Sequence, residues 1–216
     1  PILVSPDGHT YRTLPTICDG AAPNTVTLSA FALSADGTRV AYGDWTRTAP
    51  GSSALHVVDL ASGQVSTFAM PGSGNGEQIT NVTWSPDGTR IAYSAASITE
   101  LPLTSPGEGQ ATQDDAILDL ATGRHTPLPA APYAWSADGQ QLLVGPPYAT
   151  GTMYPETNSL EIVDSAGKTV RTIPTGSLID VQLSAGMWSS AAQAIATVAR
   201  ANNLNDSSSQ PHDSWS

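Results

Sequence analysis

The chain has 216 residues, of which 19 are glycine and 17 proline, and only 12% are charged. This composition favours many short strands joined by tight turns, and the length suits a single all-β domain. The formal charge of −11 disfavours nucleic acid and anionic lipid surfaces as partners. No apolar run approaches the roughly 18 residues of a membrane-spanning helix, so direct membrane insertion is not expected. Cys18 is the only cysteine, which excludes an intrachain disulfide and a cysteine-based zinc cluster.

The first predicted element is a hairpin over residues 2–15. Its start, Ile-Leu-Val-Ser-Pro-Asp-Gly, contains a turn motif that recurs later in the chain. The whole segment nevertheless aligns better with residues 161–174, Glu-Ile-Val-Asp-Ser-Ala-Gly-Lys-Thr-Val-Arg-Thr-Ile-Pro. We therefore interpret residues 2–15 as the outer hairpin of a four-stranded unit.

The next elements are copies of one hairpin that recurs every 51 residues. The copies are 33–42 (Leu-Ser-Ala-Asp-Gly-Thr-Arg-Val-Ala-Tyr), 84–93 (Trp-Ser-Pro-Asp-Gly-Thr-Arg-Ile-Ala-Tyr) and 135–144 (Trp-Ser-Ala-Asp-Gly-Gln-Gln-Leu-Leu-Val). A second hairpin follows each copy, beginning with residues 55–63, 117–123 and 160–167. Every turn ends on glycine, as expected where a type I turn is followed by a residue with positive φ. Two hairpins per repeat predict the four-stranded antiparallel blades of a β-propeller.

The recurring polar and aromatic residues are predicted to be structural. The tryptophans at the first strand of each repeat are expected to pack between neighbouring blades; they are Trp84, Trp135 and Trp188. The recurring turn residues are expected to hydrogen-bond nearby backbone, so we do not interpret them as members of a catalytic triad. They are Ser34, Ser85, Ser136, Asp36, Asp87 and Asp138.

Residues 188–198 align with the hairpin at 84–94 but lack its Asp-Gly turn. They are interpreted as a degraded inner hairpin. A helix over 187–200 is an open alternative, because the apolar residues from Trp188 to Ala199 also fall on one helical face and Ser190 with Gln193 could form a capping box. Residues 201–216 are polar and without periodicity, so they are predicted to be a disordered tail or linker after a propeller of residues 1–200.

The hairpin count predicts how the ring closes. There are four inner and four outer hairpins, with an outer one at the N-terminus and an inner one at the C-terminus. The preferred arrangement is a four-bladed propeller in which the two ends share one blade, since closure removes exposed sheet edges. The alternative is an open fragment of a larger propeller.

The motif at residues 84–93, followed by Asp-Leu-Ala-Thr-Gly at 119–123, resembles the TolB-like (WD-repeat-like) propeller repeats. The resemblance covers residues 2–200 and implies a bacterial extracytoplasmic setting, whether periplasmic, secreted or the ectodomain of a membrane protein. That family includes scaffolds, sensor ectodomains and propellers attached to prolyl-oligopeptidase-type hydrolases, and its members usually have six or more blades. This chain contains no Gly-x-Ser-x-Gly elbow and has no room for an α/β-hydrolase sheet.

The long connections are predicted to share one face of the propeller, opposite the short hairpin turns. They span residues 44–54, 95–115 and 146–159 within blades, and 16–30, 71–81 and 175–186 between blades. Binding residues gather on loops that a rigid scaffold holds, so this long-loop face is the expected binding surface. The alternative is that its side chains are ordinary solvated loop residues without a binding role. The candidate binding residues are Asp44, Trp45, Arg47, Glu100, Asp114, Asp115, Tyr148, Tyr154 and Glu156.

No metal or other cofactor is expected. Asp114 and Asp115, with Glu108 nearby, could offer oxygen ligands to Ca²⁺, but the spacing of an EF-hand loop is absent and solvated carboxylates are the better interpretation. The four histidines are predicted to be surface side chains rather than metal ligands: His9, His56 and His125 on outer hairpins, and His212 in the tail.

These features predict a non-enzymatic binding or scaffold module for a protein or peptide partner in the bacterial cell envelope. A propeller-type lactonase or lyase is the competing class, and it would need carboxylates or histidines converging at the propeller axis. A third interpretation is the accessory propeller of a prolyl-oligopeptidase-like hydrolase whose catalytic domain is absent from this chain.

Overall fold

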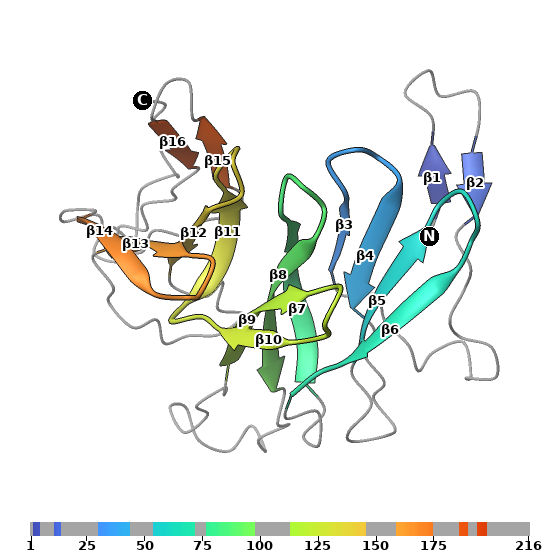
Figure 1. Ribbon diagram of the computed structural model, residues 1–216, viewed down its shortest axis with the longest axis horizontal. Helices are drawn as coiled ribbons and strands as arrows, with labels where there is room; N and C mark the ends of the chain where they lie inside the picture. Colours follow the sequence, from blue (N-terminus) through green and yellow to red (C-terminus); the bar gives the residue numbers. More distant parts are fainter. Residues whose placement is uncertain are drawn as a thin grey trace, which may run out of the picture.

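A computed structural model describes residues 2–4, 11–13, 30–43, 54–71, 77–97, 113–145, 159–174, 186–189 and 194–197. Within these ranges every regular element is a β-strand, and the strands form three antiparallel four-stranded sheets and two two-stranded ones (Figure 1). In the same ranges no helix is long and apolar enough to cross a membrane. The predicted all-β class and the four-stranded repeating unit are confirmed. The predicted tail at 201–216 lies outside the described residues.

Each four-stranded sheet is an antiparallel meander in chain order, as a propeller blade requires. The first blade contains β3 (Phe31–Leu33), β4 (Arg39–Gly43), β5 (Ala54–Asp59) and β6 (Val65–Ala69). The second contains β7 (Glu77–Trp84), β8 (Arg90–Ser97), β9 (Gln113–Asp119) and β10 (His125–Pro127). The third contains β11 (Ala131–Trp135), β12 (Gln141–Gly145), β13 (Ser159–Asp164) and β14 (Thr169–Pro174).

The two remaining sheets are the terminal hairpins. The N-terminal hairpin joins β1 (Ile2–Val4) to β2 (Tyr11–Thr13), and the C-terminal hairpin joins β15 (Gly186–Ser189) to β16 (Ala194–Thr197). Trp188 pairs with Ile195, in the same register that pairs Trp84 with Ile91. The degraded hairpin predicted at 188–198 is therefore a hairpin, and its described residues do not form the alternative helix.

The predicted shared blade does not form. The terminal hairpins belong to separate sheets, with β15 next to β11 at one end of the array and β1–β2 at the other (Figure 1). The blades follow one another in an open arc, and three blades with one terminal hairpin do not turn far enough to bring the two ends together. The four-bladed closed ring is thus corrected to the alternative arrangement, a partial, open propeller.

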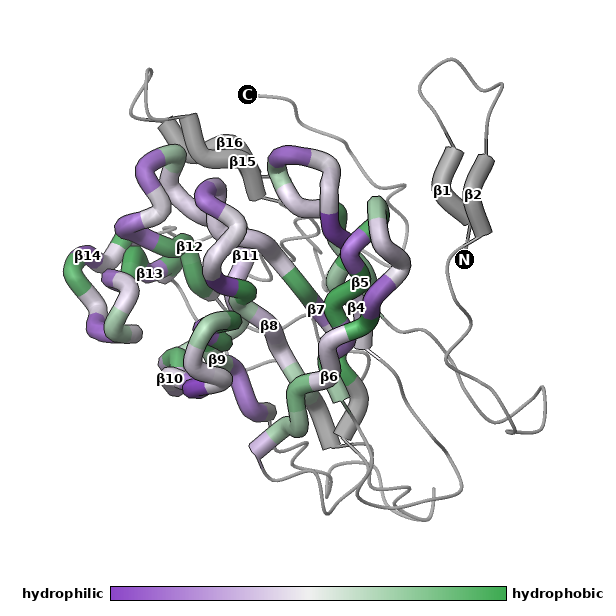
Figure 2. Tube along the Cα trace, turned by 45° about the vertical axis from the view of Figure 1, so that its right-hand side comes forward, coloured by the Kyte–Doolittle hydropathy of each residue, from purple (hydrophilic) through white to green (hydrophobic). Residues whose placement is uncertain are grey.

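The largest parts of the described hydrophobic core are two layers between blades. Alternate residues of β8 face opposite neighbours: Ile91 and Tyr93 pack in the cluster shared with the first blade, and Ala92 in the cluster shared with the third. All three are at most 1% exposed. Figure 2 shows that the apolar stretches run along the strands, while the turns are more polar. The second blade is therefore covered on both faces.

The hairpin turns confirm the roles predicted for their recurring residues. The Ser34 hydroxyl donates to an Asp36 carboxylate oxygen at 2.6 Å, and the Thr38 backbone N–H donates to the same oxygen at 3.0 Å. The equivalent bonds recur in the second and third blades. Gly37 follows with φ of 70°, and the five other turn glycines have φ between 66° and 78°.

Candidate functional site

The short turns of a blade share one face of the molecule, as predicted. The Leu60 N–H of the outer turn donates to the Thr38 carbonyl of the inner turn at 2.8 Å, and Leu120 bonds to Thr89 in the second blade at 3.1 Å. We call this side the turn face. The C-terminal ends of β4, β8 and β12 lie on the opposite side, which is the predicted long-loop face (Figure 1).

Only two of the nine predicted binding residues lie in the described ranges. They are Asp114 and Asp115, and both lie in strand β9 rather than in a loop. Asp114 pairs with Ala95 and Asp115 with Ser94, because β8 and β9 continue their ladder into the segment that was predicted to be a loop. The predicted connection at 95–115 is corrected accordingly. Outside the described residues lie Asp44, Trp45, Arg47, Glu100, Tyr148, Tyr154 and Glu156.

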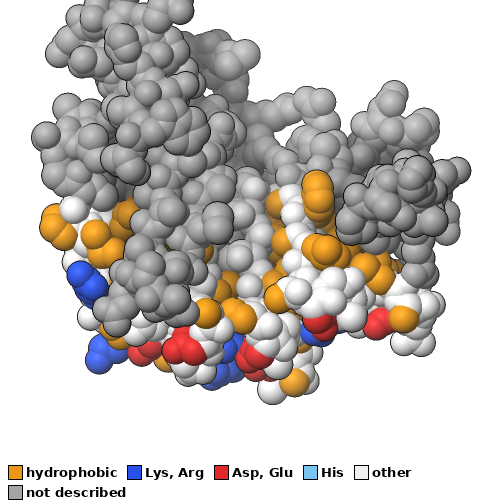
Figure 3. Space-filling view, turned by 90° about the horizontal axis from the view of Figure 1, so that it is seen from above, with side chains coloured by type: hydrophobic (Ala, Val, Ile, Leu, Met, Phe, Trp, Pro, Cys, Tyr) orange, Lys and Arg blue, Asp and Glu red, His pale blue; other side chains and the backbone are white. Residues whose placement is uncertain are grey.

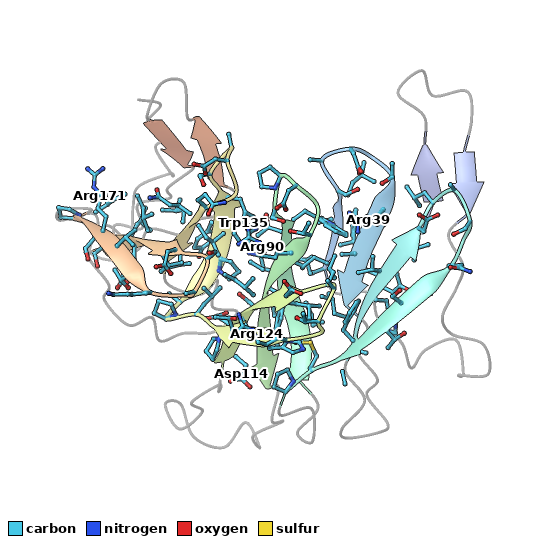
Figure 4. The ribbon with its side chains drawn as sticks, viewed as in Figure 1. Arg39, Arg90, Asp114, Arg124, Trp135 and Arg171 are labelled. Carbon is cyan, nitrogen blue, oxygen red and sulfur yellow. The ribbon has the colours of Figure 1, made fainter. Side chains whose placement is uncertain are left out.

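The two aspartates differ in their surroundings. Asp114 is exposed near the long-loop end of β9, where Figure 4 labels it. Asp115 is half-buried and lies on the same face of the sheet as Ile117, whose side chain packs in the cluster shared with the third blade. Strand alternation therefore separates the pair, and only Asp115 faces the junction of the second and third blades.

Two polar side chains of the second blade lie at this junction, and the charge of one of them acts on a tyrosine of the third. Ser94 lies opposite Asp115 across the β8–β9 ladder and on the same sheet face. It is only 1% exposed, and its hydroxyl has no hydrogen-bond partner among the residues that the structure describes. Burial and the negative charge of Asp115 raise the pKa of Tyr133, on β11 of the third blade. Its phenol therefore remains protonated at neutral pH. We call Ser94, Asp115 and Tyr133 the loop-end cluster.

The opposite end of the molecule holds a recurring contact between blades. At the first junction the Arg39 guanidinium lies over the Trp84 ring, 4.9 Å from its centroid, and Nη2 donates to the Gly88 carbonyl at 2.6 Å. Trp84 Nε1–H donates back to the Ala32 carbonyl of the first blade at 3.0 Å. Trp84 is 8% exposed. The tryptophan is thus buried between blades, as the repeat predicts.

The second junction repeats the contact. Arg90 lies 5.0 Å from the centroid of the Trp135 ring and donates to the Gly139 carbonyl at 2.7 Å (Figure 4). Trp135 Nε1–H donates to the Thr83 carbonyl at 3.4 Å. Sequence reasoning missed these arginines, although Arg39 and Arg90 recur 51 residues apart. We call this arrangement the arginine clamp, and its role is to hold adjacent blades together.

The turn face has no surface of a single charge among the described residues. Figure 3 shows basic and acidic side chains intermixed there, with hydrophobic side chains beside them. The turn carboxylates accept bonds from their own turns, which lowers the pKa of Asp36 to about 2, mainly through the Ser34 hydroxyl and the Thr38 N–H. These carboxylates therefore stabilise the turns.

The described histidines are structural. His56 is 5% exposed, stacks on Tyr42 at 5.2 Å, and its Nδ1 hydrogen-bonds the Thr67 hydroxyl at 3.0 Å. The prediction of a surface side chain is wrong for His56, because Tyr42 and Thr67 on the neighbouring strands cover it. His125 is half-buried and contacts the Tyr93 hydroxyl at 2.8 Å, and burial lowers its pKa.

No group of three or more potential metal ligands occurs in the described part of the chain. Of the three residues considered as Ca²⁺ ligands, Asp114 and Asp115 face different sides of their sheet, and Glu108 lies outside the described residues. Among the histidines, His9 and His212 also lie outside the described residues.

Solved structures resemble this fold. The β-propeller domain of the Trilobed protease from Pyrococcus furiosus, which has an open velcro topology, matches with a TM-score of 0.51 and 18% identity over 76% of this chain. Dipeptidyl peptidase 4 of Porphyromonas gingivalis matches with a TM-score of 0.54 and 10% identity over 92% of this chain. This chain spans only 46% and 38% of those two chains. Neither a protein-family model nor a curated protein matches it. The likeness shows the β-propeller fold.

Proposed function

We propose that this chain is a non-enzymatic propeller module that binds a protein or peptide through its long-loop face. The observation that supports the proposal is the loop-end cluster, where a buried Ser94 hydroxyl that has no hydrogen-bond partner among the described residues lies beside Asp115, near the long-loop end of β8 and β9. A buried polar group without a partner costs free energy, so such a group is expected where a further hydrogen-bonding group completes the site. The TolB-like motif adds the proposal of an extracytoplasmic setting.

The chemistry of the cluster suits a peptide with a basic or amide donor. The Asp115 carboxylate can accept from a backbone N–H or a Lys or Arg side chain, and the oxygen of a protonated Tyr133 can accept from a peptide donor. The net charge of −11 favours the approach of basic segments. The candidate loop residues from Asp44 to Glu156 would extend the contact around this point.

Peptides selected from a display library against the full chain provide the test. We expect the selected peptides to be basic, and we expect Asp115→Asn and Tyr133→Phe each to raise their Kd by about tenfold, equivalent to about 1.4 kcal/mol, in isothermal titration calorimetry. Asp138→Asn on the turn face is the matched control and should leave Kd unchanged. Peptides whose affinity fell with Asp138→Asn rather than with Asp115→Asn would bind the turn face, and this result would contradict the proposal.

A second candidate is the accessory propeller of a peptidase. It is favoured by the likeness to the propeller domain of the Trilobed protease and to dipeptidyl peptidase 4. In that case the parent polypeptide must contain a catalytic domain beside this propeller. Sequencing the coding region on both sides of these residues distinguishes the candidates, because an adjoining hydrolase domain would support the peptidase and its absence would remove it.

A further inference from the structure

The first strand of the first blade exposes an apolar face. Phe31 is 77% exposed and Leu33 is 52% exposed. In the second blade the equivalent repeat positions are Val82 and Trp84, which are only 7% and 8% exposed. These two positions are therefore buried in the second blade and exposed in the first, although Val40, Tyr42 and Val58 on the same sheet face of the first blade are at most 3% exposed. We call Phe31, Leu33 and the Gly37 turn the open junction face.

The two formed junctions show what covers such a face. In each, an arginine at the start of the preceding blade's second strand stacks on the tryptophan and donates to the carbonyl of the turn glycine. The guanidinium lies so close to that turn that a Cβ at Gly88 would come within 2.5 Å of Arg39 Nη2. At Gly37 a Cβ would meet no atom within 4 Å. Among the described residues, none fills at Gly37 the space that an arginine fills at Gly88.

A second copy of this chain does not supply the missing part. The donor position is Arg39 in the first blade and Arg90 in the second, but it is Gln141 in the third blade and Ala194 in the terminal hairpin. At the donor position, the end of the array that would have to meet the open junction face of another copy therefore carries no guanidinium. Neither a glutamine nor an alanine can both stack on the apolar face as a cation and donate to the turn carbonyl.

We propose that the open junction face is a docking surface for the inner hairpin of a further propeller blade whose second strand begins with an arginine. That blade packs apolar side chains on Phe31 and Leu33, and its guanidinium donates to the Gly37 carbonyl, as Arg39 does to Gly88. The proposal is independent of the peptide-binding function, because it concerns the edge of the array rather than the long-loop face.

The test supplies such a blade within the full chain. The 51-residue repeat at 26–76 is duplicated, giving residues 1–76 followed by 26–216, so that the first copy of Arg39 precedes the second copy of β3. All variants carry Cys18→Ser, so that a cysteine introduced by Phe31→Cys in the second copy is the only thiol. The rate at which a thiol reagent labels this cysteine reports the exposure of the position. We expect labelling at least about tenfold slower than at the same position in the unduplicated chain. Val65→Cys, on an outer strand that is already 39% exposed, is the matched control and should label equally in both.

Two further variants make the result decisive. Arg39→Ala in the first copy should restore a large part of the labelling rate, because the apolar contact remains while the clamp is lost. A chain with residues 77–127 inserted before residue 26 presents Arg90 instead, and so tests a second donor blade if the first does not fold. Unchanged labelling with both inserted blades would overturn the proposal. So would sedimentation showing that the unmodified chain forms a dimer that Phe31→Ser dissociates, since a second copy would then be the occupant.

Discussion

The turn aspartates show how single residues tie stability to pH. The Ser34 hydroxyl and the Thr38 N–H hold the pKa of Asp36 at about 2, below the 3.8 of an unperturbed aspartate. The unfolded chain therefore binds protons first as pH falls, so the stabilisation is complete above about pH 4 and is lost towards pH 2. We expect the urea midpoint of the protein to fall over this interval, and to fall less steeply for Asp36→Asn.

Asp114→Asn is the control for this experiment, because the Asp114 carboxylate lies outside the turns. It should reproduce the steepness of the unmodified protein. If Asp36→Asn instead shows the same dependence on pH as Asp114→Asn, the turn bonds do not persist in solution.

The arginine clamp makes a second prediction at the residue scale. Arg90 combines a charge-assisted bond to the Gly139 carbonyl with stacking on Trp135, and its side chain is 16% exposed. Arg90→Ala should lower the free energy of unfolding by about 2 kcal/mol. Arg90→Lys should recover less than half, because an ammonium group lacks the planar fork that stacks and donates together. Urea unfolding measures both, with Arg171→Ala at an exposed position as the control; equal effects of Arg90→Ala and Arg171→Ala would refute the clamp.

Which single residues could be predicted from sequence depended on repetition. Trp84 and Trp135 recur at one repeat position, and their burial between blades followed from that recurrence. The partners of these rings were missed, because contacts between blades are not visible within one repeat. The burial of His56 was missed for a related reason: strand position alone does not reveal that Tyr42 stacks on it.

At the scale of elements, the hairpins were predictable because turn chemistry is local. A serine, an aspartate and a glycine at fixed spacing specify the turn, and the strands on either side follow from it. Strand length was less predictable. The β8–β9 ladder continues to Ala96 and Gln113, beyond the apolar residues that marked the hairpin, because backbone pairing does not require apolar side chains. This extension moved Asp114 and Asp115 from a predicted loop into a strand.

Alanine substitutions at Gly37 and Gly88 distinguish the backbone strain of the turn from the contact between blades. Gly37 and Gly88 have φ of 70° and 66°, so alanine at either position costs about 1 kcal/mol of backbone strain. Only at Gly88 would the new Cβ also collide with Arg39. Gly88→Ala should therefore lower the free energy of unfolding clearly more than Gly37→Ala, as measured by urea denaturation. Gly88→Ala combined with Arg39→Ala should remove the extra loss; persistence of that loss would show that the clamp is not its cause.

At the scale of the whole molecule, closure could not be predicted from hairpin counts. Equal numbers of inner and outer hairpins permit a ring, but the turn from blade to blade depends on packing at each junction. The arc of three blades and one terminal hairpin leaves β1–β2 and β15–β16 in separate sheets. An isolated two-stranded sheet is marginally stable, whereas the second blade is covered on both faces.

This difference predicts a gradient of stability along the array. Blades contact only their neighbours, so their stabilities combine an intrinsic part with a part from each junction. Ile91, Ala92 and Tyr93 of β8 are at most 1% exposed, and we expect their amides to exchange with solvent at least about a hundredfold more slowly than those of β1 and β2. Hydrogen exchange followed by mass spectrometry measures this gradient.

Trp135→Ala tests whether the junctions act separately. It removes the aromatic ring from the second junction and leaves the first intact, so exchange should accelerate in β11 and β12 far more than in β3 and β4. Trp84→Ala, at the first junction, is the matched variant and should have the converse effect. Equal acceleration in all three blades after either change would mean that the array opens as one cooperative unit, and that the blades are coupled beyond the contacts between neighbours.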